Sequence, residues 1–214
     1  MNAPRIVVTG TDTDIGKTVF AAALTGALGA TYWKPVQAWR DDLGRSDSDR
    51  VTELSEARTL PSAFDLATPA SPHIAAEIDG VRIAPEDLAL PQIDGPLVVE
   101  GAGGVLVPIN REWLFADQFA RWGLPVVIVA RTALGTINHS LLSIEALRAR
   151  GVPILGVAFV GDAVADSEAI VCQLGRVKRL GRLPHVDPLD RIALAAAFAA
   201  NFDLADFTRA DFTT

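Results

Sequence analysis

The chain contains 214 residues, of which 50% are hydrophobic and 21% are charged, so its composition excludes disordered, collagen-like and coiled-coil proteins. With 19 basic and 26 acidic side chains the formal net charge is -7, which argues against a broad positive surface for nucleic acid or a membrane. The one cysteine, Cys172, cannot form an intramolecular disulfide, and the length fits a single domain over residues 1–214, expected in the cytoplasm.

Short apolar runs alternate with segments of helical spacing along the chain. Strands buried on both faces are expected at residues 6–8, 31–33, 96–100, 125–130 and 154–160, and helices at 19–29, 48–57, 111–123 and 138–151. The last two helices are expected to end at Gly123 and Gly151. Residues 60–96 contain six prolines and are expected to form a short helix and loops over the carboxyl edge of the sheet. The pattern predicts an α/β domain with a mostly parallel sheet flanked by helices.

The segment GTDTDIGKT, residues 10–18, follows the first strand and opens a helix, as a phosphate-binding loop does. In such a loop backbone N–H groups surround the phosphates, a lysine contacts the terminal phosphates and a hydroxyl binds Mg²⁺. Lys17 and Thr18 would have these last two roles. Five residues rather than four separate Gly10 from Gly16, and the alternative is an ordinary turn between a strand and a helix.

Lysine is scarce, because the 19 basic side chains comprise 16 arginines and only three lysines, Lys17, Lys34 and Lys178. Lys34 follows the second predicted strand, and the carboxyl ends of parallel strands face the ligand crevice in open α/β sheets. We therefore expect Lys34 beside the phosphate loop, with a solvated lysine at a strand end as the alternative. Replacing Lys34 by glutamine is expected to leave the stability of the protein nearly unchanged.

Three carboxylates are candidates for a metal site. Glu100 ends the strand at 96–100 and precedes a glycine-rich turn, so its carboxylate should reach the crevice and serve Mg²⁺; the alternative is a plain charge at a strand end. Asp47 and Asp49 precede an apolar helix, where both could be caps or one could bind the metal.

Residues 135–139, GTINH, are expected to begin the helix that follows the fourth strand. The unpaired N–H groups of a helix start suit a carboxylate or a phosphate, although an Asn or Thr cap explains the same spacing. His73 and His139 are interpreted as structural histidines. No Ser–His–Asp or Cys–His arrangement suggests a nucleophilic hydrolase.

The segments GTDTDIGKT, KPVQ, SPHI, VEGAGG and GTINH, in this order, resemble the dethiobiotin synthetase family, which has the phosphate-loop NTPase type of fold. The match spans most of the chain. The resemblance implies a ligase of biotin biosynthesis that uses ATP and Mg²⁺ to close a cyclic urea on a diamine, 7,8-diaminononanoate. Carbon dioxide would enter as a carbamate, ATP would phosphorylate that carbamate, and the second amine would displace phosphate.

The family pattern also assigns roles to residues of this chain. Lys34, with Lys17 and Thr13, would be catalytic, and Thr18, Asp47 and Glu100 would bind Mg²⁺. ATP would contact Asp14, Ile15, Gly16, Lys17, Thr18, Val19, Asp47, Glu100, Gly101, Ala102 and Gly103, and its base would lie near Val160, Gly161, Leu183, Pro184 and His185. The diamine and carbamate would contact Thr13, Lys34, Ala38 and Gly104, and the substrate carboxylate would lie at Gly135, Thr136, Ile137 and Asn138 of the neighbouring subunit in a homodimer.

Two positions depart from the family pattern. Ala38 stands where the family commonly has a Ser or Thr that contacts the substrate. Val160 stands where the family usually has an Asn that reads the adenine edge, so backbone groups would have to recognise the base and the nucleotide preference would be broader.

Two other functions fit parts of the pattern. A nucleotide-driven switch ATPase of the partition or septum-positioning type would share the fold, but such proteins carry an additional lysine early in the loop, where this chain has Thr11 and Asp12. A related ligase acting on another amine is the second alternative.

Overall fold

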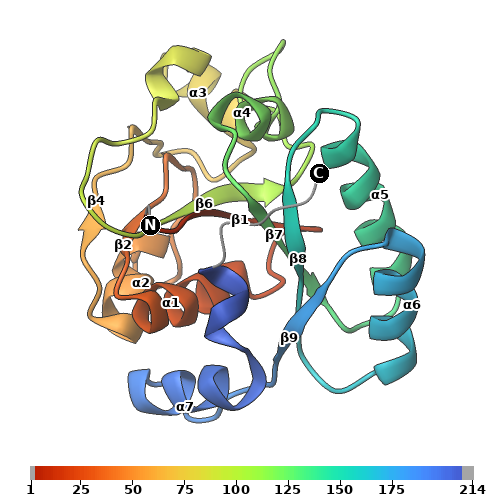
Figure 1. Cartoon of the computed structure of the whole chain (residues 1–214). Coiled ribbons are helices and arrows are strands. Elements are labelled where there is room, and N and C mark those ends of the chain that lie inside the picture. The colour runs from red at the N-terminus through yellow and green to blue at the C-terminus, as the bar shows by residue number, and fades with distance from the viewer. Residues whose placement is uncertain (1–2, 209–214) are drawn as a thin grey trace.

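The computed structural model describes residues 3–208, and its central feature is a parallel sheet of seven strands (Figure 1). The order across the sheet is β4-β2-β6-β1-β7-β8-β9. The strands are β1 (Arg5–Gly10), β2 (Thr31–Trp33), β4 (Thr59–Leu60), β6 (Leu97–Gly104), β7 (Val126–Arg131), β8 (Ile154–Val160) and β9 (Arg179–Leu183). A separate pair, β3 (Val36–Gln37) and β5 (Phe64–Asp65), is also parallel. The ends of the predicted domain, residues 1–2 and 209–214, lie outside the described residues.

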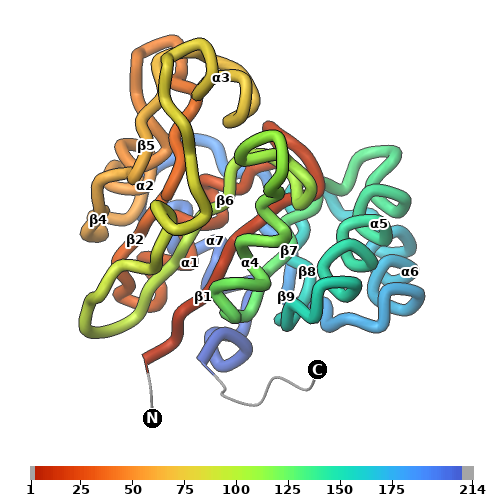
Figure 2. The backbone as a smooth tube through the Cα atoms, turned by 90° about the horizontal axis from the view of Figure 1, so that it is seen from above, coloured from red at the N-terminus to blue at the C-terminus, as the bar shows by residue number. Residues whose placement is uncertain are grey.

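Helices cover both faces of the sheet and divide the core into two clusters. One face packs against α1 (Lys17–Leu28), α2 (Asp47–Ser55) and α7 (Arg191–Asn201), and the other against α3 (Pro72–Ile78), α4 (Phe115–Trp122), α5 (Thr136–Arg148) and α6 (Ala165–Gly175). Residues 6–8 of strand β1 are apolar because both faces of the strand are buried. Ile6 and Val8 belong to the cluster with α1, α2 and α7, whereas Val7 belongs to the cluster with α3 to α6. Figure 2 shows the segments from β2 to α3 on one side of β1 and helices α5 and α6 on the other.

Local sequence accounts for several helix ends. Helix α1 is rich in alanine and ends before Gly29, whose φ of 57° is favourable for glycine. Helix α4 ends before Gly123 at φ 64°, as predicted. Helix α5 ends at Arg148, and Gly151, at φ 65°, lies just past its final turn, so this predicted end is confirmed as well. The N–H of Gly151 donates to the carbonyl of Arg148 and the N–H of Val152 donates to that of Leu147, which are the two bonds of a Schellman cap.

The predicted fold class is confirmed, and so are the five predicted strands. Six elements are absent from the sequence-based prediction: β3, β4, β5, β9, α6 and α7. The short 3₁₀ turns at Pro85–Leu88 and Leu204–Phe207 are absent from it too. The proline-rich segment contains the expected short helix, α3, near the carboxyl edge. The segment then returns to the amino edge of the sheet, where the Pro91 carbonyl accepts a 2.6 Å hydrogen bond from Arg5, the first residue of β1.

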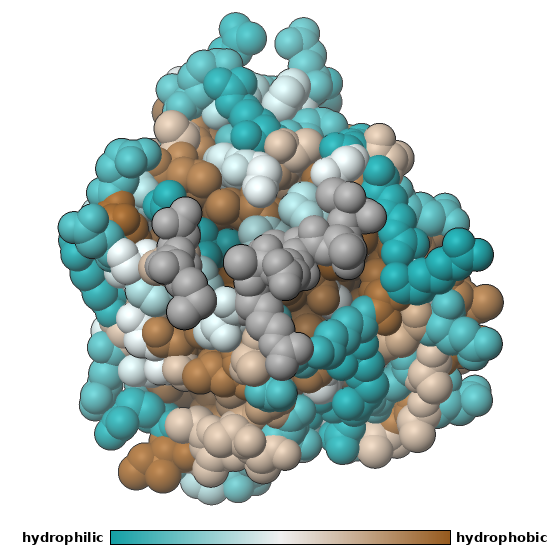
Figure 3. Space-filling view, in the orientation of Figure 1, coloured by the Kyte–Doolittle hydropathy of each residue, from teal (hydrophilic) through white to brown (hydrophobic). Residues whose placement is uncertain are grey.

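No helix within residues 3–208 is long and apolar enough to cross a bilayer, and α5 has only 13 residues. On the face drawn in Figure 3, hydrophilic side chains line much of the outline, and apolar side chains are visible between them.

Candidate active site

Two glycines shape the loop between β1 and α1. Gly16 has a φ of 90°, and a Cβ there would lie 2.8 Å from Cγ1 of Val160. A Cβ on Gly10 would lie 2.7 Å from Cδ1 of Ile15. Side chains at these positions would therefore collide with the packed loop. The loop leads into the first turn of α1, whose N–H groups lack acceptors within the helix and suit a phosphate.

Lys17 folds back over this loop, where its Nζ donates a 2.8 Å hydrogen bond to the carbonyl of Asp12. The residue is 7% exposed, and this burial lowers the pKa of Lys17 to about 8, against the opposing influence of the Glu100 carboxylate. The ammonium is thus a poorly solvated charge. An anionic ligand in the loop would stabilise it.

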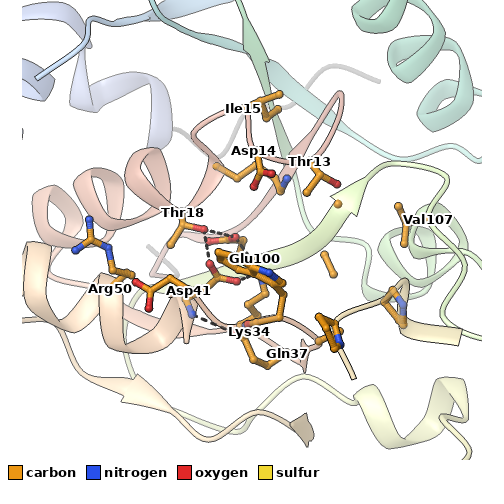
Figure 4. Close-up of a pocket in the computed structure, with 18 of the residues that line it drawn as sticks. Thr13, Asp14, Ile15, Thr18, Lys34, Gln37, Asp41, Arg50, Glu100 and Val107 are labelled. Carbon is orange, nitrogen blue, oxygen red and sulfur yellow. Dashed lines mark hydrogen bonds and ion pairs between the residues drawn. The ribbon is translucent and has the colours of Figure 1, made fainter. Parts of the chain in front are cut away.

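A cluster of charged and polar side chains from four elements lies next to the loop (Figure 4). Nζ of Lys34, just after β2, lies 3.1 Å from Oε1 of Glu100 in β6 and forms an ion pair with Asp47, the first residue of α2. Oγ1 of Thr18 lies 2.9 Å from Oδ1 of Asp47 and 2.9 Å from Oε1 of Glu100. Strands β2 and β6 are neighbours with Trp33 opposite Val99, so Lys34 and Glu100 follow at the next position of this register.

The electrostatics favour an ion pair despite the burial. Burial by itself lowers the pKa of Lys34, but the carboxylates of Glu100 and Asp47 outweigh it and raise that pKa well above its usual value. Burial likewise opposes the charged form of Asp47, yet the Lys34 ammonium and the hydrogen bond from Thr18 lower its pKa. Lys34 and Asp47 are therefore charged at neutral pH.

The same cluster fits a divalent cation. Two carboxylates and a hydroxyl converge, and the single proton of Thr18 can satisfy only one of the two carboxylate oxygens that lie 2.9 Å away. Oxygen ligands of this kind are those that Mg²⁺ prefers. Within residues 3–208 no group of three or more His, Cys, Asp or Glu side chains forms a metal site.

The loop and the cluster open into one cavity of about 630 Å³. Of the residues predicted to contact ATP, metal, carbamate or diamine, it is lined by Thr13, Asp14, Ile15, Gly16, Lys17, Thr18, Val19, Lys34, Ala38, Asp47, Glu100, Ala102 and Gly103. Gly101 and Gly104 lie behind this lining. A Cβ on Gly101 would lie 2.9 Å from Cζ of Phe119, and one on Gly104 would lie 3.5 Å from the carbonyl of Thr11.

The structure separates the two aspartates between which the sequence left a choice. Asp47 points to the cavity, while Asp49 accepts hydrogen bonds from the backbone N–H and the hydroxyl of Ser46, at 2.8 Å and 2.7 Å. Ser46 is the N-terminal cap of α2, so neither aspartate is the cap itself. Asp49 completes the capping box, which leaves Asp47 for the cluster.

The residues predicted to surround the base form a separate group beside the loop. The N–H of Gly161 donates a 3.0 Å bond to the carbonyl of Leu183, and a Cβ on Gly161 would lie 3.8 Å from Nε2 of His185. Val160 packs against Gly16 of the loop. These residues and Pro184 do not line the cavity, so of this group only the contact of Val160 with Gly16 connects it to the loop.

The predicted start of α5 also lies outside the cavity. Gly135, with φ 95°, precedes Thr136 at the first helical position, which confirms the predicted helix start. The buried Oγ1 of Thr136 has no hydrogen-bond partner among the described residues, whereas Leu134, two positions earlier, is fully exposed. Ile137 and Asn138 continue the first turn.

Comparison with known proteins identifies the family. Residues 4–193 match the model of a family described as an AAA domain. The chain is 64% identical to the ATP-dependent dethiobiotin synthetase BioD of Rhodopseudomonas palustris (strain BisB18) over 208 residues, which are 96% of this chain and 99% of that protein. It is 63% identical to the protein of the same name from Novosphingobium aromaticivorans over 204 residues, 94% of this chain and 98% of that protein. The chain belongs to the dethiobiotin synthetase family.

Solved structures outside the dethiobiotin synthetase family share the fold. The cell division ATPase MinD of Pyrococcus furiosus has a TM-score of 0.58 and 16% identity, covering 91% of this chain and 88% of that one. A ParA family ATPase from Chlorobium tepidum TLS has a TM-score of 0.57 and 13% identity, covering 93% and 92%. The expected phosphate-loop NTPase type of fold is confirmed.

Several residues that shape the site had no predicted role. Gln37 accepts a 3.2 Å hydrogen bond from the N–H of Asp47, which holds the start of α2 against the cavity. Tyr32 donates a 2.9 Å hydrogen bond to Oε2 of Glu100. The sequence carried a signal for Tyr32, because it lies two residues before Lys34, and alternate residues of a strand point to the same face. Arg45 and Arg50 also line the cavity.

Proposed function

We propose that the chain is an ATP-dependent dethiobiotin synthetase that closes a cyclic urea on 7,8-diaminononanoate with carbon dioxide. The observation that carries this proposal is the position of Lys34, between Asp47 and Glu100 in the cavity that also contains the phosphate loop. The names of the full-length relatives support it. Because ATP is the co-substrate, we place the reaction in the cytoplasm.

In this proposal the triphosphate lies along residues 14–19, with the first turn of α1 and Lys17 contacting its oxygens. Thr18, Asp47 and Glu100 would hold Mg²⁺. When bound, that ion supplies neutralising charge to the phosphate oxygens. The base would lie against Val160 and Gly161, where valine offers no hydrogen bond to adenine.

The reaction needs three bond changes. One amine nitrogen attacks carbon dioxide and loses a proton, which gives a carbamate. A carbamate oxygen then attacks the γ-phosphorus, the bond to the bridging oxygen breaks, and ADP leaves. The second amine attacks the carbamate carbon, the bond from that carbon to the phosphate oxygen breaks, and phosphate and a proton leave.

The residues of this chain contribute mainly charge and position. The ammonium groups of Lys34 and Lys17 would stabilise the negative charge that develops as the phosphoryl group moves to the carbamate. Thr13 and the turn from Glu100 to Gly104 would line the carbamate and the diamine. Ala38 lines the cavity without a hydroxyl, so the substrate would have one polar contact fewer there than in the family pattern.

A homodimer would complete the site. The start of α5, from Gly135 to Asn138, does not line the cavity of its own chain, which agrees with the family pattern, where this helix start contacts the substrate carboxylate from the neighbouring subunit. The fully exposed Leu134 and the unpartnered hydroxyl of Thr136 support contact with a ligand or another chain. Mixing Lys34→Gln and Asn138→Ala chains tests this, because mixed dimers with shared sites would restore about a quarter of the activity. No restoration in dimers shown to exchange subunits would refute a shared site.

The direct test supplies purified protein with the diamine, bicarbonate and MgATP and measures both phosphate release and product mass. Phosphate release should require the diamine, whereas a switch ATPase would hydrolyse ATP without it. Lys34→Gln should lower turnover at least about 100-fold, comparable to losing a charge stabiliser of roughly 3 kcal/mol. Lys178→Gln, at an exposed lysine that pairs with Asp206, is the matched control and should retain turnover. Unchanged turnover in Lys34→Gln, or no product from the wild type, would refute the assignment.

A further inference from the structure

The two oxygens of the Glu100 carboxylate have different surroundings. Oε1 faces the cavity cluster, 2.9 Å from Oγ1 of Thr18 and 3.1 Å from Nζ of Lys34. Oε2 points away from this cluster and accepts a 2.9 Å hydrogen bond from the hydroxyl of Tyr32. The carboxylate therefore has one oxygen for the site and one that is already bonded.

Tyr32 is firmly placed to keep that bond. Tyr32 and Glu100 are both 0% exposed and lie on the neighbouring strands β2 and β6. A carboxylate oxygen can only accept a hydrogen bond, so the hydroxyl of Tyr32 is the donor in this contact. Tyr32 does not line the cavity, so it can act on a ligand there only through Glu100. It is also the one tyrosine of the chain.

We propose that Tyr32 is a positioning residue that holds Oε2 of Glu100, so that this carboxylate offers a single oxygen to the cation and the site favours Mg²⁺ over Ca²⁺. This inference rests on the metal site of the proposed function. Mg²⁺ is small and requires near-octahedral ligands, whereas Ca²⁺ accepts more ligands, including both oxygens of one carboxylate. A glutamate that cannot turn its second oxygen toward the ion withholds the coordination that would help Ca²⁺ most.

The test compares Tyr32→Phe with the wild type by calorimetry with a non-hydrolysable ATP analogue. The dissociation constant is measured in EDTA, in saturating Mg²⁺ and in saturating Ca²⁺, and the metal effect is the EDTA value divided by the value in that metal, so a larger number means a larger gain in affinity. Tyr32→Phe should leave the EDTA value unchanged, because the phosphate loop is intact. It should lower the Mg²⁺ effect about 10-fold or more, the usual loss when a group that orients a metal ligand is removed. The Ca²⁺ effect should fall much less or rise.

Thr25→Val is the matched control, because it removes another fully buried hydroxyl, whose hydrogen bond goes to the carbonyl of Ala21 within α1 rather than to a residue of the cluster. It should leave both metal effects at the wild-type values. If Tyr32→Phe lowers the Mg²⁺ and Ca²⁺ effects equally, or lowers neither, the proposed role of Tyr32 is overturned. In that case a metal effect in the wild type still supports the metal site. Absence of any metal effect in the wild type would instead overturn the metal site itself.

Discussion

Removing the Lys34 ammonium should destabilise the ligand-free protein. Its side chain is 6% exposed, that of Glu100 is 0% exposed, and Asp47 pairs with the same ammonium. Lys34→Met keeps most of the aliphatic volume but leaves a buried carboxylate without its cation. Breaking a buried ion pair on one side costs about 3–5 kcal/mol, and because Asp47 is partly exposed we expect the lower end, about 3 kcal/mol. This result would contradict the sequence-based expectation that replacing Lys34 leaves stability nearly unchanged.

Thermal unfolding in EDTA measures this loss. For a chain of this length about 3 kcal/mol corresponds to a fall in Tm of roughly 6–12 °C. Saturating Mg²⁺ with a nucleotide analogue should recover much of the loss, because a bound cation would again neutralise Glu100 and Asp47. Arg121→Met is the control, since it breaks an exposed ion pair with Glu86 and should cost less than about 1 kcal/mol. If Lys34→Met melts within a degree or two of the wild type in EDTA, the argument from buried charge is refuted.

Three further outcomes follow from the geometry. Asp47→Asn should reduce the metal-dependent gain in nucleotide affinity at least about 10-fold. Asp49→Asn should leave that gain intact and cost less than about 1 kcal/mol of stability. Similar losses of nucleotide affinity in both variants would refute the separate roles of the two aspartates. Val160→Asn should improve the preference for ATP over other nucleoside triphosphates by about 3- to 10-fold, and an unchanged profile in competition binding would show that the base lies elsewhere. Hydrogen bonds from the Thr68 hydroxyl and nearby backbone lower the pKa of Asp79, so the unfolded chain binds more protons in acid and the stabilisation by Asp79 is lost as pH falls. The difference in unfolding free energy between the wild type and Asp79→Asn should therefore narrow from pH 7 to about pH 3. A difference that stays constant over this range would contradict the prediction.

Features that depend only on neighbouring residues could be predicted from the sequence. Residues 6–8 form a strand because β-branched residues suit a strand buried on both faces, and Gly16 and Lys17 mark the loop because phosphate binding requires a tight turn before a helix. Lys34 and Glu100 could be assigned to one edge because parallel strands all end at the same side of the sheet. Strand β9 could not be recognised, because RLGRL has no apolar run and is held by pairing with β8. Helix α7 did carry an unused signal, an alanine-rich segment after the cap Asp190.

Tertiary structure alone decided how the side chains share the site. Asp47 and Asp49 are two residues apart in similar sequence, and only the turn of α2 against Gln37 directs Asp47 into the cavity and leaves Asp49 to the capping box. The hydrogen bond from Tyr32 to Glu100 joins residues 68 positions apart. It forms because β2 and β6 are neighbours in the sheet, although they are far apart in the sequence. Strand order and helix rotation depend on burying apolar surface across the whole chain, so local patterns do not contain them.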